Sequence, residues 1–311
     1  MSNQEPQIIT NKQEMRNWSR NIRSQGKTIG FVPTMGYLHQ GHLSLIKQAQ
    51  KHTQHIVVSI YVNPGQFSQT EDLSTYPSDI LGDIEKLKSF GGVDVVFSPR
   101  NLYDYGESEK GVVKNSEKDG KIVSFLEGEG VKHETWIRVE TLEKGMCGMS
   151  RPVFFRGVAT IVAKLFNIVE PDVAIFGKKD YQQWRVIQRM VRDLDFGVKV
   201  IGSELMRDED GLAMSSRNVH LSPQEREQAL SISRSLFEAK LAAKNGKSIC
   251  SELRRSVIES IEAAGGKIDY VEIVDQESLE SVEQIKSGVV ICVAAWFGKV
   301  RLIDNIEIDV S

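Results

Sequence analysis

The sequence has few cysteines, little net charge and no long apolar run, and each shortage excludes a class of protein. Three cysteines in 311 residues, Cys147, Cys250 and Cys292, are an odd number without metal-ligand spacing, which argues against a disulfide framework and a structural zinc site. A formal net charge of -3 supplies no basic field for nucleic acid or an anionic membrane. No apolar run reaches the roughly 18 residues that cross a bilayer, and no signal peptide is visible. We therefore expect a soluble, cytoplasmic protein with no nucleic acid and no membrane as partner.

Short apolar runs alternate with helical patterns over the first two thirds of the chain. The strand-like runs are 28–32, 56–62, 93–97, 173–176 and 198–201. Helical patterns follow the first run, with Leu43, Ile46 and Ala49 on one face, and recur at 79–89, 158–169 and 181–194. This alternation predicts an α/β fold, a doubly wound parallel sheet of the Rossmann-like type.

Two changes in composition divide the chain further. Residues 105–130 are rich in Gly, Glu, Lys and Ser and predict a surface insertion. Ser222-Pro223-Gln224-Glu225 supplies an N-cap, an N1 proline and an N3 glutamate, and strand-like runs follow at 268–274 and 289–296. We expect a Rossmann-like domain at 1–203 and a smaller α+β C-terminal lid domain at 204–311.

The segment Pro33-Thr34-Met35-Gly36-Tyr37-Leu38-His39-Gln40-Gly41-His42 stands where the first strand passes into the first helix. Ligands of doubly wound sheets bind at such strand ends, and the start of a helix favours anions. His39 and His42 could therefore both face a triphosphate, with Gly41 leaving room for the nucleotide. Two neighbouring histidines can equally be polar surface residues.

A second polar segment, Met214-Ser215-Ser216-Arg217-Asn218, falls at the expected domain junction. Two hydroxyls and a guanidinium can bind phosphate oxygens from the side opposite the histidines. The alternative is a polar hinge loop. The histidine segment and this segment together favour a nucleotide site.

These two segments resemble the His-x-Gly-His and Lys-Met-Ser-Lys-Ser signatures of nucleotidylyltransferases. The pantothenate synthetase family is a closer match, and five blocks resemble it in order: PTMGYLHQGH, VSIYVNPGQF, FRGVATIVAKLFNIV, FGKKDYQQ and RDEDGLAMSSRN. The resemblance implies a ligase that uses ATP and Mg²⁺ to activate pantoate as an acyl adenylate, then condenses it with β-alanine to give pantothenate, AMP and pyrophosphate. It also implies a homodimer, and the insertion suggests a plant-like member.

The resemblance carries site residues over to this chain. The catalytic set is His42 as proton donor with His39, Lys179, Arg217, Ser215 and Ser216. The ATP-binding set is Met35, Gly36, His39, Gly41, His42, Gly177, Lys179, Asp180, Met206, Met214, Ser215, Ser216 and Arg217. The set for pantoate or β-alanine is Pro33, Thr34, Met35, Asn63, Gln66 and Gln183. Amides suit a polyol acid because they both donate and accept hydrogen bonds. Asp83 matches a position associated with Mg²⁺.

Several alternatives stay open. Lys178 and Lys179 could form a solvated loop, and Asp83 could be a surface residue of its helix. Many relatives have a second acidic residue where this chain has Gly82, and histidine where it has Phe154. The rival functions are another nucleotidylyltransferase, whose product keeps the nucleotide, and a nucleotide-sensing module without catalysis. The run Thr135–Val139 predicts an edge strand that could form the dimer contact.

Overall fold

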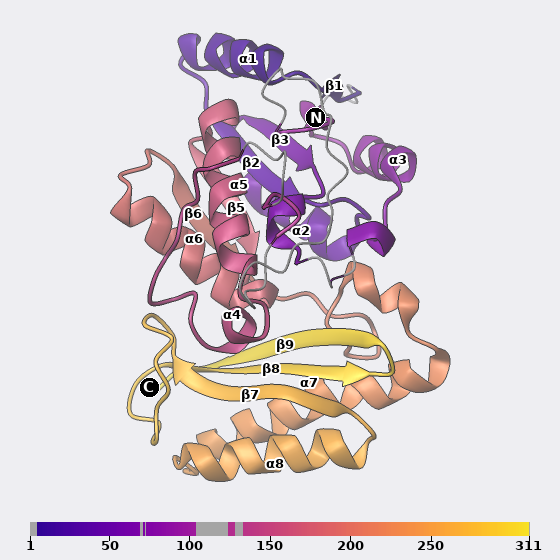
Figure 1. Ribbon diagram of the computed structural model, residues 1–311, viewed down its shortest axis with the longest axis vertical. Coiled ribbons are helices and arrows are strands. Elements are labelled where there is room, and N and C mark those ends of the chain that lie inside the picture. Colours follow the sequence, from indigo (N-terminus) through magenta and orange to yellow (C-terminus); the bar gives the residue numbers. More distant parts are fainter. Residues whose placement is uncertain (1–4, 69–70, 72, 104–123, 128–132, 311) are drawn as a thin grey trace.

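A six-stranded parallel sheet forms the centre of the first part of the chain. The computed structural model describes residues 5–68, 71, 73–103, 124–127 and 133–310 (Figure 1). The strands are β1 (Gln7–Ile9), β2 (Ile29–Thr34), β3 (His55–Ile60), β4 (Val95–Phe97), β5 (Val173–Gly177) and β6 (Lys199–Ser203). Their order is β1-β4-β3-β2-β5-β6, with every pair parallel. The predicted α/β doubly wound fold is confirmed.

The strand order reverses between β2 and β5. The chain leaves β2 for β3 on one side and leaves β5 for β6 on the other, while β2 and β5 pair directly, Gly30 opposite Val173 and Phe31 opposite Ala174. The carboxyl ends of β2 and β5 therefore flank a topological switch point, where doubly wound folds bind their ligands. The histidine segment follows β2, and the Lys178–Asp180 turn follows β5.

Helices cover both faces of this sheet. They are α1 (Lys12–Ser24), α2 (Gln40–Ala49), α3 (Ile80–Phe90), α5 (Phe154–Val169) and α6 (Tyr181–Asp193). The short helix α4 (Met146–Ser150) lies between α5 and strand β7 (Lys267–Asp275) of a second sheet. Alternation along β2 separates the two cores. Phe31 packs in the cluster that includes Phe166 of α5, whereas Val32 packs with Ile46 of α2 and Leu87 of α3.

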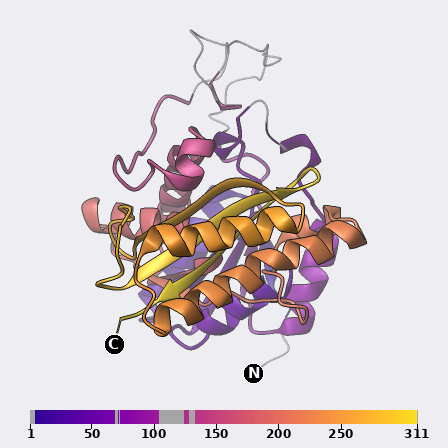
Figure 2. The same ribbon diagram turned by 90° about the horizontal axis from the view of Figure 1, so that it is seen from below.

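A three-stranded antiparallel sheet and two helices form the second part. They are α7 (Pro223–Lys244), α8 (Cys250–Ala263), β7 (Lys267–Asp275), β8 (Val289–Phe297) and β9 (Val300–Ile308), in the sheet order β7-β8-β9. As predicted, Ser222 is the N-cap of α7 and forms a capping box with Glu225. Figure 2 shows α7 and α8 covering the outer face of the sheet. Along β8, Ile291 packs under these helices, whereas Cys292 belongs to the core that includes α5 and α6.

The structure corrects the sequence predictions in two respects, the elements that were missed and the edge strand that was expected. The sequence did not indicate β1, α1 or β9. The predicted edge strand at Thr135–Val139 is wrong, because no residue of this segment is in a strand. The N–H of Ile137 donates instead to Thr160 Oγ1 of α5 (3.0 Å), and Trp136 packs against Arg156 of the same helix. Most of the 105–130 insertion lies outside the described residues. Within the described ranges, no helix combines the length and apolarity of a membrane span.

Candidate functional site

A large cavity opens at the switch point and extends to the antiparallel sheet. Its volume is about 1430 Å³, above the roughly 300 to 1,000 Å³ of most ligand pockets, so it has room for more than one small molecule. Most of the site residues expected from the sequence line it: Pro33, Thr34, Met35, His39, Gly41, His42, Asn63, Gln66, Gly177, Lys179, Asp180, Gln183, Met206, Met214, Ser215, Ser216 and Arg217. Gly36 and Asp83 do not.

The two histidines cap the helix that they begin. His39 is the N-cap of α2, and its Nδ1 accepts the N–H of Gly41 (3.2 Å). His42 Nδ1 accepts the N–H of His39 (3.3 Å), and the ring centroids lie 4.1 Å apart. Because Nδ1 is an acceptor in each ring, each neutral imidazole carries its proton on Nε2. The pair therefore offers two Nε2–H donors at a wall of the cavity.

Both imidazoles are held neutral. Burial, with Lys179 nearby, lowers the pKa of His39 from 6.5 to about 4. Burial, then His39 and Lys179, lowers the pKa of His42 from 6.5 to about 3. Near neutral pH, the rings act as uncharged hydrogen-bond donors, and the positive charge beside them comes from Lys179.

The glycine at position 41 gives space to the His39 ring. A Cβ added at Gly41 would lie 2.8 Å from Cε1 and 2.9 Å from Nδ1 of His39. That ring is fixed by its bond to the Gly41 N–H and cannot easily move aside. Glycine here makes room for the histidine ring. It also lines the cavity, and room for a nucleotide at this position stays a prediction.

Asp83 shapes the turn between β2 and α2. The turn contains two left-handed residues, Gly36 (φ 86°) and Tyr37 (φ 52°). The carboxylate of Asp83 accepts the N–H groups of Tyr37 (2.7 Å) and Leu38 (2.6 Å), and Lys86 donates to the Leu38 carbonyl (3.0 Å). Asp83 is fully buried, and burial raises the pKa of its carboxyl. This arrangement gives no support to direct Mg²⁺ ligation by Asp83.

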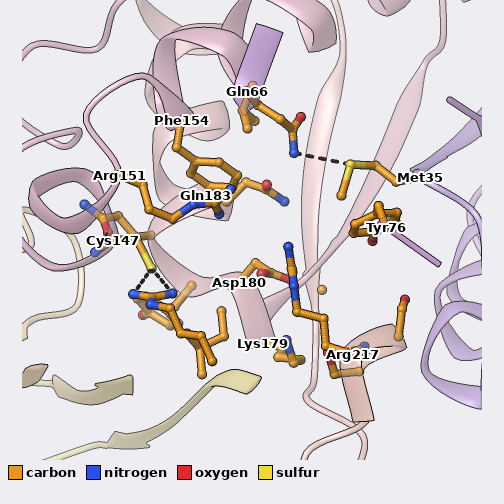
Figure 3. A pocket seen from close by; sticks show the side chains of 18 of the residues that line it. Met35, Gln66, Tyr76, Cys147, Arg151, Phe154, Lys179, Asp180, Gln183 and Arg217 are labelled. Carbon is orange, nitrogen blue, oxygen red and sulfur yellow. Dashed lines mark hydrogen bonds between the residues drawn. The ribbon is translucent and has the colours of Figure 1, made fainter. Parts of the chain in front are cut away.

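Asn63 holds Gln66 with a defined orientation. Asn63 Nδ2 donates to Gln66 Oε1 (3.0 Å) and to the Gly157 carbonyl (3.1 Å), and Asn63 Oδ1 accepts from the Tyr103 hydroxyl (2.9 Å). With Oε1 occupied, Gln66 turns its Nε2 toward the cavity, where it donates to Met35 Sδ (3.3 Å; Figure 3). A thioether is a weak acceptor. Gln66 is therefore the amide available to a ligand, with Asn63 behind it.

Gln182 and Gln183, at the start of α6, have different surroundings. Gln182 is buried and donates to the carbonyls of Leu142 (2.9 Å) and Gly145 (3.1 Å), while accepting the N–H of Cys147 (3.1 Å). The side chain of Gln183 forms no hydrogen bond with the part of the chain that the structure describes, and it lines the cavity. Figure 3 shows its amide in the same space as Gln66. Gln182 stabilises the fold, and Gln183 is available to a ligand.

The two lysines after β5 also differ. Lys178 forms ion pairs with Glu204 and Glu307, each at 2.7 Å. Lys179 lines the cavity, and within the described ranges its side chain has no ion pair or hydrogen bond. Asp180 lies beside it as the N-cap residue of α6. The cation that a ligand meets here is Lys179.

The Met214–Arg217 segment closes the other side of the cavity. It pairs back on the chain, with the N–H of Met214 donating to the Met206 carbonyl (3.0 Å). Ser215 caps a 3₁₀ turn (Ser216–His220) and accepts the N–H of Arg217 (3.3 Å). The Arg217 guanidinium lies 5.3 Å from the centre of the Tyr76 ring. Ser215, Ser216 and Arg217 line the same cavity as the two histidines, and Figure 3 shows Arg217 beside Tyr76.

Arg151 is also in the cavity wall, although the sequence analysis did not select it. Its guanidinium pairs with Glu71 and lies 3.9 Å from the centre of the Phe154 ring. Burial lowers the pKa of Arg151. Phe154 replaces the histidine of many relatives with an aromatic face, which attracts a cation. The place of Arg151 four residues before the 155–169 block was the available signal.

Comparisons with known proteins identify the family of this chain. Residues 7–307 match the family model described as pantoate-beta-alanine ligase. The pantoate-beta-alanine ligase of Arabidopsis thaliana is 67% identical over 99% of both chains. Pantothenate synthetase from Thermus thermophilus superposes with a TM-score of 0.82 at 38% identity, over 96% of this chain and 98% of that one. The pantoate-beta-alanine ligase of Francisella tularensis was solved in complex with beta-gamma ATP and beta-alanine. It superposes with a TM-score of 0.72 at 32% identity, over 97% of this chain and 97% of that one.

These matches cover nearly the whole chain, and they confirm the family expected from its five sequence blocks. They also agree in fold, because the solved structures superpose on both sheets of the chain over almost all its length. The plant-like character is supported by a second plant relative, from Lotus japonicus, at 65% identity over 98% of this chain and 99% of that one. The chain therefore belongs to the pantoate-beta-alanine ligase family and is an enzyme that joins pantoate to β-alanine.

Proposed function

We propose that this cavity performs both steps of the ligation. In the first step, a carboxylate oxygen of pantoate attacks the α-phosphorus of ATP, and the bond from that phosphorus to pyrophosphate breaks. In the second, the amine of β-alanine attacks the carbonyl carbon of the mixed anhydride, and AMP leaves. A carboxylate needs no general base, so the first step depends on alignment and on stabilising the charge of the phosphates.

The nucleotide is assigned to the histidine side of the cavity. His42 and His39 donate Nε2–H bonds to phosphate oxygens without competing for a proton, because both rings are neutral. Lys179 and Arg217 supply the positive charge, and Ser215 and Ser216 add hydroxyls. Asp180, with two carboxylate acceptors, suits the ribose hydroxyls. The ATP-bound Francisella relative supports ATP as co-substrate.

Pantoate is assigned to the two glutamines. It carries a carboxylate, two hydroxyls and two methyl groups, so its site needs amide donors and acceptors beside an apolar wall. Gln66 and Gln183 supply the amides, and Phe154, Val158 and Met35 supply the wall. Neither glutamine adds a charge that would repel or trap the carboxylate. After adenylation, Gln66 is placed to meet β-alanine.

Mg²⁺ belongs to this proposal only as the ion that accompanies ATP. Its ordinary ligands are phosphate oxygens, water and one or two carboxylates. Asp83 fits that task poorly, because its oxygens already accept two backbone N–H groups and the residue is buried outside the cavity lining. No His, Cys, Asp or Glu cluster suited to a metal occurs among the described residues. We assign no step to the ion.

Three further features are part of the proposal. Residues 204–311 act as a lid over the 1–203 domain, since the segment 214–217 lies at the cavity and the reactive anhydride must be shielded from water. The enzyme works as a homodimer. It works in the cytoplasm, which agrees with three buried cysteines that all remain thiols.

The observation that carries the proposal is one cavity lined by neutral His39 and His42, the cation of Lys179 and the available amides of Gln66 and Gln183. The test is exchange of labelled pyrophosphate into ATP, with and without pantoate. Exchange that requires pantoate supports adenylation of pantoate. Exchange that depends on another acceptor or on CTP would point to another nucleotidylyltransferase, and ATP binding without exchange would point to a sensing module.

A further inference from the structure

The turn that presents Lys179 to the cavity has no side-chain cap of its own. The turn Lys178–Asp180 follows β5 directly, and neither it nor the start of α6 has a side-chain cap among the described residues. The ammonium group of Lys179 forms no hydrogen bond to any described residue, and the four-carbon stem that carries it is flexible. The direction of its ammonium group therefore depends on how firmly the backbone of the turn is held from outside.

Asn305 of β9 holds that backbone from the second sheet. Its Nδ2 donates to the carbonyl of Lys178 and to the carbonyl of Lys179, both at 2.9 Å. The Asn305 side chain lies among buried groups, with only 8% of the residue exposed, so these bonds have little competition from water. One amide group thus fixes two successive peptide units on either side of the Lys179 Cα.

Glu307, two residues further along β9, fixes the side chains that flank Lys179. One carboxylate oxygen accepts from Lys178 Nζ (2.7 Å), and the other accepts from the Tyr181 hydroxyl (3.0 Å). Burial, with the charge of Glu307, raises the pKa of Tyr181, so the hydroxyl keeps its proton and stays a donor. The residues before and after the Lys179–Asp180 pair are therefore anchored to the same carboxylate.

Asp304, which precedes Asn305 in β9, anchors the loop on the opposite side of the cavity. Asp304 is buried and accepts two bonds from the Arg207 guanidinium, at 2.6 and 2.9 Å. Arg207 directly follows Met206, and the chain returns from there to the Met214–Arg217 segment. Consecutive residues of one strand thus hold the two loops that face each other across the cavity.

From these contacts we propose that Asn305 and Glu307 are positioning residues for adenylate formation, acting through the Lys178–Asp180 turn to direct Lys179 at the phosphates. This inference rests on the proposed role of Lys179. It also gives the second sheet a task in the first chemical step, beyond covering the cavity. Asn305 lies in the cavity wall, but its Nδ2 donates both of its hydrogens to the turn. In this scheme Asn305 and Glu307 act on rate rather than on pantoate binding.

The test compares Asn305→Leu with Gln50→Leu, a matched control. Gln50 Nε2 also donates to two successive carbonyls, those of Gly91 and Gly92 (both 3.2 Å), but away from the cavity. Asn305→Leu should lower kcat for pantoate-dependent ATP–pyrophosphate exchange roughly ten- to a hundredfold, with the KM for pantoate unchanged, as expected for a misplaced catalytic group. Gln50→Leu should leave kcat unchanged, although it should shift the melting temperature about as much as Asn305→Leu does.

A double variant separates positioning from other effects. If Asn305 acts through Lys179, Asn305→Leu should cause little further loss in a protein that already carries Lys179→Ala. Losses that multiply, or an Asn305→Leu enzyme within about twofold of wild type, would overturn the inference while leaving the proposed function intact. If Lys179→Ala itself exchanges normally, the proposed role of Lys179 fails, independently of Asn305. Should Asn305→Leu not fold, Glu307→Gln must show the same loss of kcat with unchanged KM, and normal kcat would reject the proposal.

Discussion

Replacing His42 by glutamine should make the free energy of unfolding less dependent on pH between about pH 5 and pH 7. The folded protein lowers the pKa of His42 from 6.5 to about 3. Below pH 6.5 the unfolded chain therefore binds a proton that the folded chain does not, and stability falls as the pH falls. Glutamine keeps the helix cap, because Gln at N3 is a normal partner of a capping box, but it removes the titration.

The expected size follows from the pKa difference. Each pH unit below the unfolded pKa costs about 1.4 kcal/mol for a group that stays neutral in the folded state, which gives about 2 kcal/mol from His42 at about pH 5. Because the cavity is open to water, we take about half of that, about 1 kcal/mol, as the measurable difference. His39, which also helps to lower the pKa of His42, titrates in the same direction in both proteins.

The assay is urea unfolding followed by tryptophan fluorescence at about pH 7.5 and about pH 5. Wild type should lose about 1 kcal/mol more than His42→Gln between the two values. His52→Gln, at an exposed position just after α2, is the matched control and should behave as wild type. If wild type and His42→Gln lose the same free energy, His42 is not neutral in the folded state, and the reasoning about its Nε2–H donor is refuted.

Three other predictions concern the site and its support. His42→Ala should lower pantoate-dependent ATP–pyrophosphate exchange at least about a hundredfold with unchanged circular dichroism; near wild-type exchange would contradict the assignment. Lys179→Ala should reduce single-turnover adenylate formation far more than Lys178→Ala, because only Lys179 faces the cavity without a partner among the described residues; equal losses would mean that the turn acts through bulk charge. Gly157→Ala should lower the free energy of unfolding by about 1 to 3 kcal/mol in urea titrations, since its Cβ would lie 2.2 Å from a backbone carbonyl oxygen. Gly197→Ala, with nothing within 4 Å among the described residues, is the control, and equal effects would show that the close approach at Gly157 is not limiting.

The strands that could be predicted from the sequence are those in which nearly every residue is buried in the core. The runs that became β2, β3 and β5 are buried nearly throughout, so their hydrophobicity alone marked them as parallel strands. β1 is three residues long, too short for any period to be read. α1 buries Met15, Ser19 and Ile22, and the serine weakens the apolar stripe.

Strand β9 was not predicted because polar residues interrupt its apolar pattern, and some of the same residues hold the loops of the cavity. Arg301, Asp304, Asn305 and Glu307 interrupt its apolar pattern, and each of them forms contacts with residues far away in sequence. Arg151 was missed likewise, because its ion-pair partner Glu71 becomes a neighbour only in the folded chain. The edge strand predicted at Thr135–Val139 failed because β-propensity is a weak preference, and helix α5 offered the Ile137 N–H another acceptor.

The mutual capping of His39 and His42 has a consequence for affinity. A side chain that becomes immobile only when a ligand binds costs about 0.5 to 1.5 kcal/mol of rotamer entropy at that moment. The two imidazoles lose this freedom earlier, when α2 forms and their Nδ1 atoms accept backbone N–H groups. A nucleotide that reaches them meets two donors that are already ordered, whereas Lys179 still has a flexible stem to immobilise. The histidines therefore contribute geometry at little entropic cost on binding, and most of the ordering that accompanies nucleotide binding falls on the long cationic side chains.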